Sequence, residues 1–348
     1  VGAVYQHPWD VTVDEGMLAF YYASFQDAAP VYASHVAARE VGLRGRPVHP
    51  LLLLNIGISF SVHDVSERAI AHLAYIDVRF PDACYPGDTL RARSRVLGVK
   101  PVSSGGKGVV HVATEVVNQD ERVVCAFERK ALVRAGKNDE RPLVSNPGAP
   151  FSSAGDARAP KEVLDALPSL APPRAGFPLF YEDLEVGDVF AHEFGRTVSD
   201  AEAMQLATLF RNSHPLHTDE VTCRSTSFAK TRVVYGGLVL AWVLALASRD
   251  TAGNAIWDLG LDDGAHPSGV LAGDTLYAAS RVEAKQARGP NAGAVTLRVV
   301  GVKNVPAAAL LASGADLFTP ELGKHDDRVP EKVVEIQRTL LVRRRREA

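Results

Sequence analysis

The sequence predicts an α+β protein built from two tandem copies of one domain, and two observations carry this prediction. First, Val1-Gly2-x-Val4 recurs as Val186-Gly187-x-Val189, an offset of 185 residues. Second, Pro86-Gly87-Asp88-Thr89-Leu90 recurs as Ala272-Gly273-Asp274-Thr275-Leu276, an offset of 186 residues. A fixed period of this size indicates a duplicated domain. In each copy an apolar helix precedes three or four antiparallel strands, so we expect each sheet to wrap around a buried helix.

The elements of the first copy follow from polar caps, apolar runs and turn residues. Asp14 and Glu15 begin a short helix at 15–24. A proline-bearing loop leads to an apolar helix at 51–59 and somewhat beyond. Strands bounded by a Gly-Asp-Thr turn are predicted at 90–99, 109–116 and 122–133.

The second copy repeats this order of elements. A short helix is predicted at 201–210, after Ser199 and Asp200, and an apolar helix at 237–248. Strands are predicted at 276–283, 294–302 and 333–342. An insertion at 304–330 precedes the last of these strands. It is too long for an ordinary hairpin loop, so we expect a lid or a packing arm.

The domain organisation follows from the repeat and from one biased segment. Residues 1–135 form the first copy and residues 179–348 the second. Residues 136–178 are rich in Pro, Ala, Ser and Gly and are predicted to be a linker with one helical turn at 161–166. Two matched copies should form a pseudo-twofold pair with a crevice between them.

Composition excludes several classes of function. A net charge of −3 lacks the basic surplus of a nucleic-acid-binding protein. The best apolar stretch, residues 236–248, is far too short to span a membrane. Three widely spaced cysteines without a zinc or CxxC pattern favour a reducing cytoplasm.

One loop of the second copy carries a candidate catalytic histidine. The segment reads Arg211-Asn212-Ser213-His214-Pro215-Leu216-His217, and the first-copy equivalents of Asn212 and His217 are Asp27 and Tyr32. A histidine that can exchange protons near neutral pH therefore occupies this position in one copy only. His217 could instead pack in the loop and bond to backbone, and His214 with His217 could ligate a metal, although no third ligand is evident.

Two glycines at the start of the second apolar helix form another candidate site. Gly236 and Gly237 follow Val233-Val234-Tyr235. The first N–H groups of a helix have no partner within it, and the helix dipole adds partial positive charge. Such an end can hold a developing oxyanion. The alternative is a turn that only lets the helix enter the core.

These segments, in this order, resemble the MaoC-like family of (R)-specific enoyl-CoA hydratases. The Pro215-Leu216-His217 end matches that family's loop, whereas Asn212 replaces its Asp and His214 replaces its Asn. The chain resembles more closely the mesaconyl-CoA hydratase (β-methylmalyl-CoA dehydratase) branch. The segments that carry this likeness are Tyr85–Leu90, Gly106–Val110, Val234–Gly237 and Ala272–Thr275.

The resemblance implies a tandem double hot-dog fold and the reversible hydration of a 2-enoyl-CoA thioester, with mesaconyl-CoA as the expected substrate. It implies that His217 transfers the proton, that Asn212 holds the water or orients His217, and that the N–H groups of Gly236 and Gly237 bind the thioester oxygen. It implies no cofactor and no metal, CoA being part of the substrate, and it favours a homodimer.

The expected substrate carries a free carboxylate, so a cation should face the pocket. Candidates near the motif are Arg211, Arg224 and Arg232, and Arg46 of the first copy could reach across the crevice. Further candidate substrate-binding residues are His214, Tyr235 and His266.

Three other functions stay open at this point. The chain could hydrate other enoyl-CoA substrates. It could be a hot-dog thioesterase, with Asp27 supplying the carboxylate that such enzymes usually need. It could also bind acyl-CoA without turnover.

Overall fold

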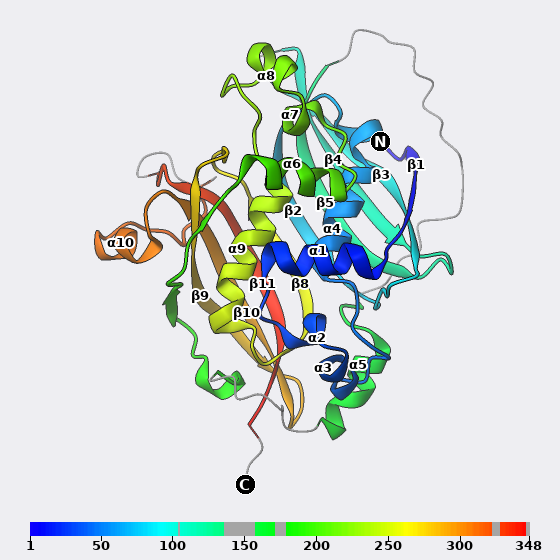
Figure 1. The fold of residues 1–348 in the computed structure, drawn as a ribbon, viewed down its shortest axis with the longest axis vertical. Coiled ribbons are helices and arrows are strands. Elements are labelled where there is room, and N and C mark those ends of the chain that lie inside the picture. The colour runs from blue at the N-terminus through cyan, green and yellow to red at the C-terminus, as the bar shows by residue number, and fades with distance from the viewer. Residues whose placement is uncertain (104, 136–156, 171–178, 322–327, 346–348) are drawn as a thin grey trace.

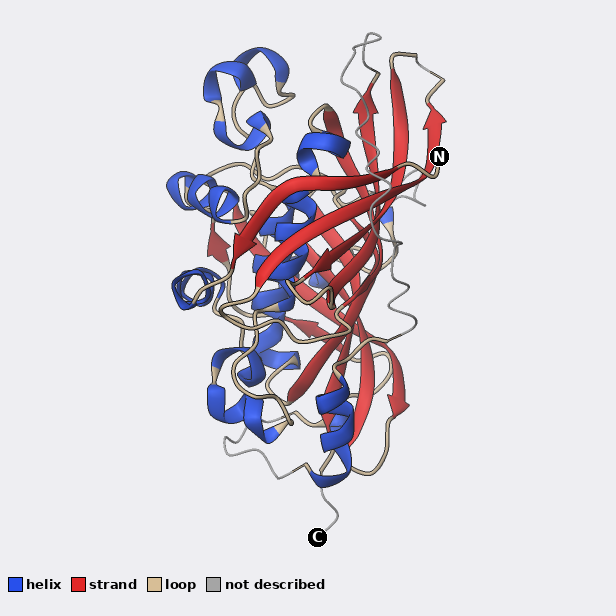
Figure 2. Cartoon of the chain, turned by 90° about the vertical axis from the view of Figure 1, so that its right-hand side faces the viewer, coloured by secondary structure: helices blue, strands red, loops and turns tan. Residues whose placement is uncertain are grey.

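The computed structural model describes residues 1–103, 105–135, 157–170, 179–321 and 328–345. Its strands form one continuous sheet in the order β1-β3-β4-β5-β2-β8-β11-β10-β9-β6, with β7 paired to β9. Most helices lie on one side of this sheet (Figure 2). The α+β prediction is therefore confirmed: an antiparallel sheet wraps around apolar helices (Figure 1).

The first copy forms half of the sheet around one buried helix. Its elements are β1 (Val4–Thr12), α1 (Glu15–Phe25), α2 (Pro30–Ala33), α3 (His35–Glu40), α4 (Pro50–Phe60), β2 (Ala69–Arg79), β3 (Thr89–Pro101), β4 (Lys107–Val117) and β5 (Val123–Arg134). Every residue of α4 is buried. Pro50 suits the first turn of this helix, and the His49 side chain accepts a hydrogen bond from the Leu51 N–H.

The second copy repeats the arrangement around α9. Its elements are β6 (Val189–Ala191), β7 (Arg196–Thr197), α6 (Asp200–Leu209), α7 (Pro215–Thr218), α8 (Glu220–Thr226), α9 (Gly236–Thr251), β8 (Ala255–Ala265), β9 (Thr275–Ala287), β10 (Ala292–Lys303), α10 (Ala307–Ala312) and β11 (Lys332–Arg343). The predicted apolar helices and strands are thus present, most with slightly wider bounds, whereas the strand predicted at 122–133 is shifted by one residue to 123–134.

The strands β2 and β8 were not among those predicted by range, and they join the two copies. Tyr75 pairs with Gly264 and Val78 with Leu261. Gly260 has φ 140°, and a Cβ there would lie 2.2 Å from the Val78 carbonyl oxygen. The pattern of β8 does not indicate a strand, because β8 contains three aspartates and two glycines. It is also buried on both faces for most of its length, so it lacks the alternation of a half-buried strand.

An Asp–His–Ser arrangement with a buried histidine and serine recurs in both copies and supports the repeat. His7 Nδ1 lies 2.8 Å from Asp64 Oδ2, and its Nε2 lies 2.8 Å from Ser94 Oγ. In the second copy His192 makes the same contacts with Asp250 and Ser280, at 2.6 and 2.9 Å. Both histidines are buried away from the cavity described below, so they hold β1 and β6 in place.

The linker and the insertion are described only in part. The predicted helical turn at 161–166 is confirmed as α5 (Lys161–Ala166), whereas residues 136–156 and 171–178 lie outside the described residues. The division into 1–135, 136–178 and 179–348 stays a prediction. The described part of the insertion packs as an arm: Ala307, Leu317 and Phe318 share a buried cluster with Ala279 and Val300 of the sheet. In the described ranges no helix is long and apolar enough to cross a membrane.

Candidate active site

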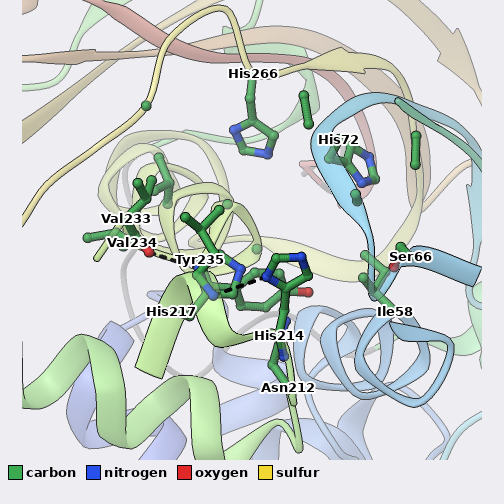
Figure 3. A pocket seen from close by; sticks show the side chains of 18 of the residues that line it. Ile58, Ser66, His72, Asn212, His214, His217, Val233, Val234, Tyr235 and His266 are labelled. Atoms are coloured by element: carbon green, nitrogen blue, oxygen red, sulfur yellow. Dashed lines mark hydrogen bonds between the residues drawn. The ribbon is translucent and has the colours of Figure 1, made fainter. Parts of the chain in front are cut away.

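A cavity of about 340 Å³ lies between the two copies, and both contribute to its wall. The polar or glycine residues that line it come from β2, β5 and the π-helical turn Val62–Ser66 of the first copy, and from the α7 loop, the start of α9 and the segment after β8 of the second. They are Ser66, His72, Tyr75, Arg129, Asn212, His214, His217, Tyr235, Gly236, Gly237, His266, Ser268 and Gly269. Figure 3 shows His72 and His266 facing His214 and His217 across this cavity.

His217 lies on α7 and is held in one tautomer by the backbone. Its Nδ1 donates a hydrogen bond to the Val233 carbonyl oxygen at 2.8 Å, which leaves the Nε2 lone pair unprotonated. Burial lowers the pKa of His217 to about 4, against a smaller raising effect of the Val233 carbonyl and with a further lowering by His214. His217 is therefore neutral at pH 7 and can accept a proton.

His214 and Asn212 position the loop that carries His217. His214 precedes α7, and its Nδ1 accepts a hydrogen bond from the Leu216 N–H at 3.1 Å. Its neutral ring therefore carries the proton on Nε2. Asn212 Oδ1 accepts from the His214 N–H at 3.0 Å. Both side chains line the cavity, and the ring centroids of His214 and His217 lie 5.6 Å apart.

The start of α9 brings unpaired backbone donors to the cavity. Gly236 and Gly237 line it, and among the described residues neither N–H has an acceptor. A Cβ on Gly237 would lie 1.8 Å from Asn55 Oδ1 of α4, so glycine is required for α4 and α9 to meet there. Tyr235 precedes the two glycines, and its ring centroid lies 5.3 Å from that of His217. Burial raises the pKa of the Tyr235 hydroxyl.

Three side chains from distant segments form the opposite wall. The Tyr75 hydroxyl lies 3.1 Å from His266 Nε2, and His266 Nδ1 lies 3.2 Å from the Val333 carbonyl oxygen. Donation from Nδ1 to that carbonyl makes Nε2 the acceptor for Tyr75. Burial lowers the pKa of His266 to about 4. Burial, and then the charge of Arg129, holds the pKa of His72 well below its usual range.

Among the described residues of the cavity wall, Arg129 on β5 is the one arginine, and it was not among the arginines predicted to face the substrate. It is 2% exposed. Its Nη2 donates to Ser61 Oγ at 2.8 Å and to Ser66 Oγ at 3.1 Å. Burial lowers the pKa of Arg129 to about 10, so it remains a cation at pH 7.

The arginines predicted to face the substrate lie elsewhere. Arg211 is exposed and outside the cavity wall, in a left-handed conformation with φ 63°. Arg232 pairs with Asp200 at 2.6 Å and Glu220 at 3.5 Å. Arg46 pairs with Glu15, and the exposed Arg224 lies 3.6 Å from Glu220. None of the four is brought to the cavity.

The equivalent position in the first copy is filled by packed side chains. Asp27 Oδ2 lies 3.5 Å from His49 Nε2, and the Tyr32 hydroxyl accepts from the Asp258 N–H at 2.9 Å. The side chains of Asp27, Tyr32 and His49 are all buried and lie outside the cavity. The carboxylate that the thioesterase alternative assigned to Asp27 is therefore not at this site, and no described residue of the cavity wall is an aspartate or glutamate.

The metal alternative gains no further ligand in the structure. Among the described residues no group of three or more His, Cys, Asp or Glu side chains could hold a metal ion. The expectation that neither metal nor cofactor takes part stays a prediction.

Comparison with known proteins assigns the chain to a family. A family model described as mesaconyl-CoA hydratase matches residues 2–308. The chain belongs to the mesaconyl-CoA hydratase family. It is 33% identical over 310 residues to the β-methylmalyl-CoA dehydratase of Chloroflexus aurantiacus, covering 88% of this chain and 87% of the relative. It is also 33% identical over 308 residues to the mesaconyl-CoA hydratase of Cereibacter sphaeroides, covering 87% and 88%.

Solved structures support the fold of this hydratase family. The chain superposes on a putative MaoC domain protein dehydratase of Chloroflexus aurantiacus with a TM-score of 0.82 and 29% identity, covering 99% of this chain and 96% of the other. A double hot-dog protein of Mycobacterium tuberculosis matches with a TM-score of 0.73 and 24% identity, covering 99% and 96%. The tandem double hot-dog fold is therefore confirmed, and the chain is a MaoC-like hydro-lyase homologue.

Proposed function

We propose that this chain catalyses the reversible hydration of mesaconyl-CoA to β-methylmalyl-CoA. Its relatives in the mesaconyl-CoA hydratase family support the reaction. The observation that carries the mechanism is the juxtaposition, in one cavity, of a neutral His217 and two N–H groups at the start of α9 that have no acceptor in the described part of the chain.

The chemistry requires one new bond at each alkene carbon. Water oxygen bonds to C3, a proton is added at C2, and the C2–C3 π bond is lost. The thioester carbonyl withdraws electrons as C3 is attacked, so negative charge builds up on its oxygen. An enzyme that binds this charge in the transition state lowers the barrier.

The N–H groups of Gly236 and Gly237 are suited to receive that charge. They line the cavity, they have no acceptor among the described residues, and they sit at the positive end of the 16-residue helix α9. In this proposal they bind the thioester oxygen, and the absence of side chains gives the substrate access to the backbone.

His217 is the proposed acid–base group. Its Nδ1–H is fixed by the Val233 carbonyl, so Nε2 accepts the proton from the attacking water. Returned to C2, the same proton completes hydration, and dehydration runs the steps backward. Asn212 cannot act as a base. Its amide oxygen accepts from the His214 N–H, which fixes the side chain, and its amide nitrogen can donate a hydrogen bond to the water.

We also propose that the protein is located in the reducing cytoplasm. The three cysteines Cys84, Cys125 and Cys223 are all buried and free, which suits that compartment. A homodimer remains a prediction, which sedimentation of the purified protein would test.

Product analysis tests the proposed reaction. Purified protein is mixed with mesaconyl-CoA, the enoyl-thioester absorbance is followed, and the product is weighed by mass spectrometry. We expect loss of absorbance and a gain of one water, without release of free CoA thiol. Thiol release would favour a thioesterase, and hydration of crotonyl-CoA alone would discard the dicarboxyl substrate. Tight binding without turnover of either compound would favour an acyl-CoA-binding protein.

A further inference from the structure

Arg129 has an equivalent in the other copy, and strand pairing establishes the match. Arg129 of β5 pairs with Tyr75 of β2 and Val112 of β4. Arg338 of β11 pairs with Leu261 of β8 and Leu297 of β10, the residues 186 and 185 positions after those two. The two arginines therefore occupy the same place in the two halves of the sheet.

Arg338 is neutralised by the protein itself. Its Nη2 lies 2.7 Å from Asp258 Oδ2, and its Nε donates to the same oxygen at 2.9 Å. Asp27 Oδ2 lies 4.0 Å from Nη2. All three side chains are buried, so this copy satisfies its buried cation with carboxylates.

The site between the copies has lost both carboxylates. Asp27 corresponds to Asn212 and Asp258 corresponds to His72, by the offsets of 185 and 186 residues. Both replacements line the cavity, and burial keeps His72 uncharged because it depresses the pKa of that ring. Arg129 bonds to two serine hydroxyls, and among the described residues its Nε has no hydrogen-bond partner and no carboxylate pairs with it.

A buried guanidinium without a counter-ion is costly, and it becomes favourable only when an anion joins it. We propose that Arg129 binds the free carboxylate of a dicarboxylic acyl-CoA substrate, which takes the place that Asp258 occupies beside Arg338. The planar guanidinium suits a carboxylate. This inference rests on the proposed function and names the residue that selects its substrate. An enoyl-CoA without a free carboxylate would leave the Arg129 guanidinium without a counter-ion and would bind less well.

Binding of unreactive thioesters tests this proposal without requiring turnover. Dissociation constants of succinyl-CoA, which carries a free carboxylate, and of butyryl-CoA, which does not, are measured by calorimetry with the full chain. We expect the protein to bind succinyl-CoA at least about 30-fold more tightly. In Arg129→Gln this preference should fall to near one, with butyryl-CoA binding kept. The matched control is Arg91→Gln, because Arg91 is an exposed arginine of the same copy that pairs with Glu121; it should keep the preference.

A second variant guards against failure of Arg129→Gln to fold. His72→Asp places in this site the carboxylate that neutralises Arg338, and we expect it to abolish the preference for succinyl-CoA while Arg129 stays in place. Equal binding of the two thioesters by the unmodified protein, or an unchanged preference in Arg129→Gln or His72→Asp, would overturn the proposal. If the preference depends on Arg129 but mesaconyl-CoA is not hydrated, the proposed reaction fails and the carboxylate site stands.

Discussion

At the residue scale, the two copies differ by an exchange of side chains around one position. The first copy places Tyr32 on α2 and His49 before α4, with ring centroids 4.8 Å apart. The second places His217 on α7 and Tyr235 before α9, 5.3 Å apart. In the second copy the histidine of the pair, His217, lines the cavity and can exchange a proton there. In the first copy the histidine of the pair, His49, is buried against Asp27.

Removal of the His217 imidazole should therefore abolish most of the activity. We expect His217→Ala to lower kcat for mesaconyl-CoA hydration by about 10²–10⁴-fold, the usual contribution of a positioned acid–base group. The rate is measured from the enoyl-thioester absorbance, and circular dichroism checks the fold.

Tyr32→Phe is the matched control for this variant. It deletes a buried hydroxyl that accepts from the Asp258 N–H at the equivalent position, so it should cost about 1–3 kcal/mol of stability and leave kcat unchanged. Equal rates for His217→Ala and the parent protein would remove His217 from the mechanism.

The acid limb of the pH–rate profile should report the same residue. Since burial lowers the pKa of His217 to about 4, the base form persists through neutral and mildly acidic pH. We expect kcat/KM measured from initial rates to stay level between pH 8 and 6 and to fall only as pH approaches about 4. A limb centred near 6.5, the value of an unperturbed histidine, would contradict this environment.

At the element scale, the junction of α4 and α9 decides whether the oxyanion site forms. A Cβ on Gly237 would lie 1.8 Å from Asn55 Oδ1 and 2.7 Å from the Tyr235 ring. On Gly236 it would meet His266 Nε2 at 2.9 Å. We expect Gly237→Ala to destabilise the protein by about 1–3 kcal/mol or more through overpacking, and to lose activity.

Gly236→Ala provides the comparison, because a Cβ on Gly236 would lie 2.9 Å from its nearest atom, His266 Nε2, whereas a Cβ on Gly237 would lie 1.8 Å from its nearest atom. Its loss of stability in urea unfolding should be smaller than that of Gly237→Ala. The reverse order would show that the helix junction is not as closely packed as described.

Elements with strong local signals could be predicted from the sequence, whereas the facing wall of the site could not. The Gly236-Gly237 pair and the Pro215-Leu216-His217 run are each continuous in the sequence, so they could be predicted from the sequence alone. His72, Tyr75 and Arg129 come from β2 and β5, where single polar residues within strands carry no local pattern. Alignment of Arg129 with Arg338 across the 304–330 insertion could have revealed Arg129. Both copies have an arginine at this position, whereas the two aspartates near Arg338 are replaced by Asn212 and His72 near Arg129.

At the scale of the whole molecule, the buried neutral histidines make stability depend on pH. The pKa values of His217 and His266 are about 4 in the folded protein, against about 6.5 in an unfolded chain. Between these values the unfolded state binds more protons, so stability falls as pH drops from above 6.5 towards 4. We expect each histidine to cost roughly 1–2 kcal/mol between pH 7 and 5.

Urea unfolding at the two pH values measures this loss. His266→Gln removes one titrating group and should reduce the difference between pH 7 and pH 5 by its share. An identical difference in the variant and the parent protein would mean that His266 titrates normally in the folded state.

The two copies share one working site, since both contribute residues to the cavity wall. We propose that water adds reversibly to the substrate in that cavity. The most direct measurement starts separate reactions from mesaconyl-CoA and from β-methylmalyl-CoA and follows both compounds by mass spectrometry. We expect the two mixtures to converge on one composition, and neither to do so with His217→Ala on the same timescale. Failure of the parent protein to interconvert the two thioesters would show that it is not a hydratase for this pair.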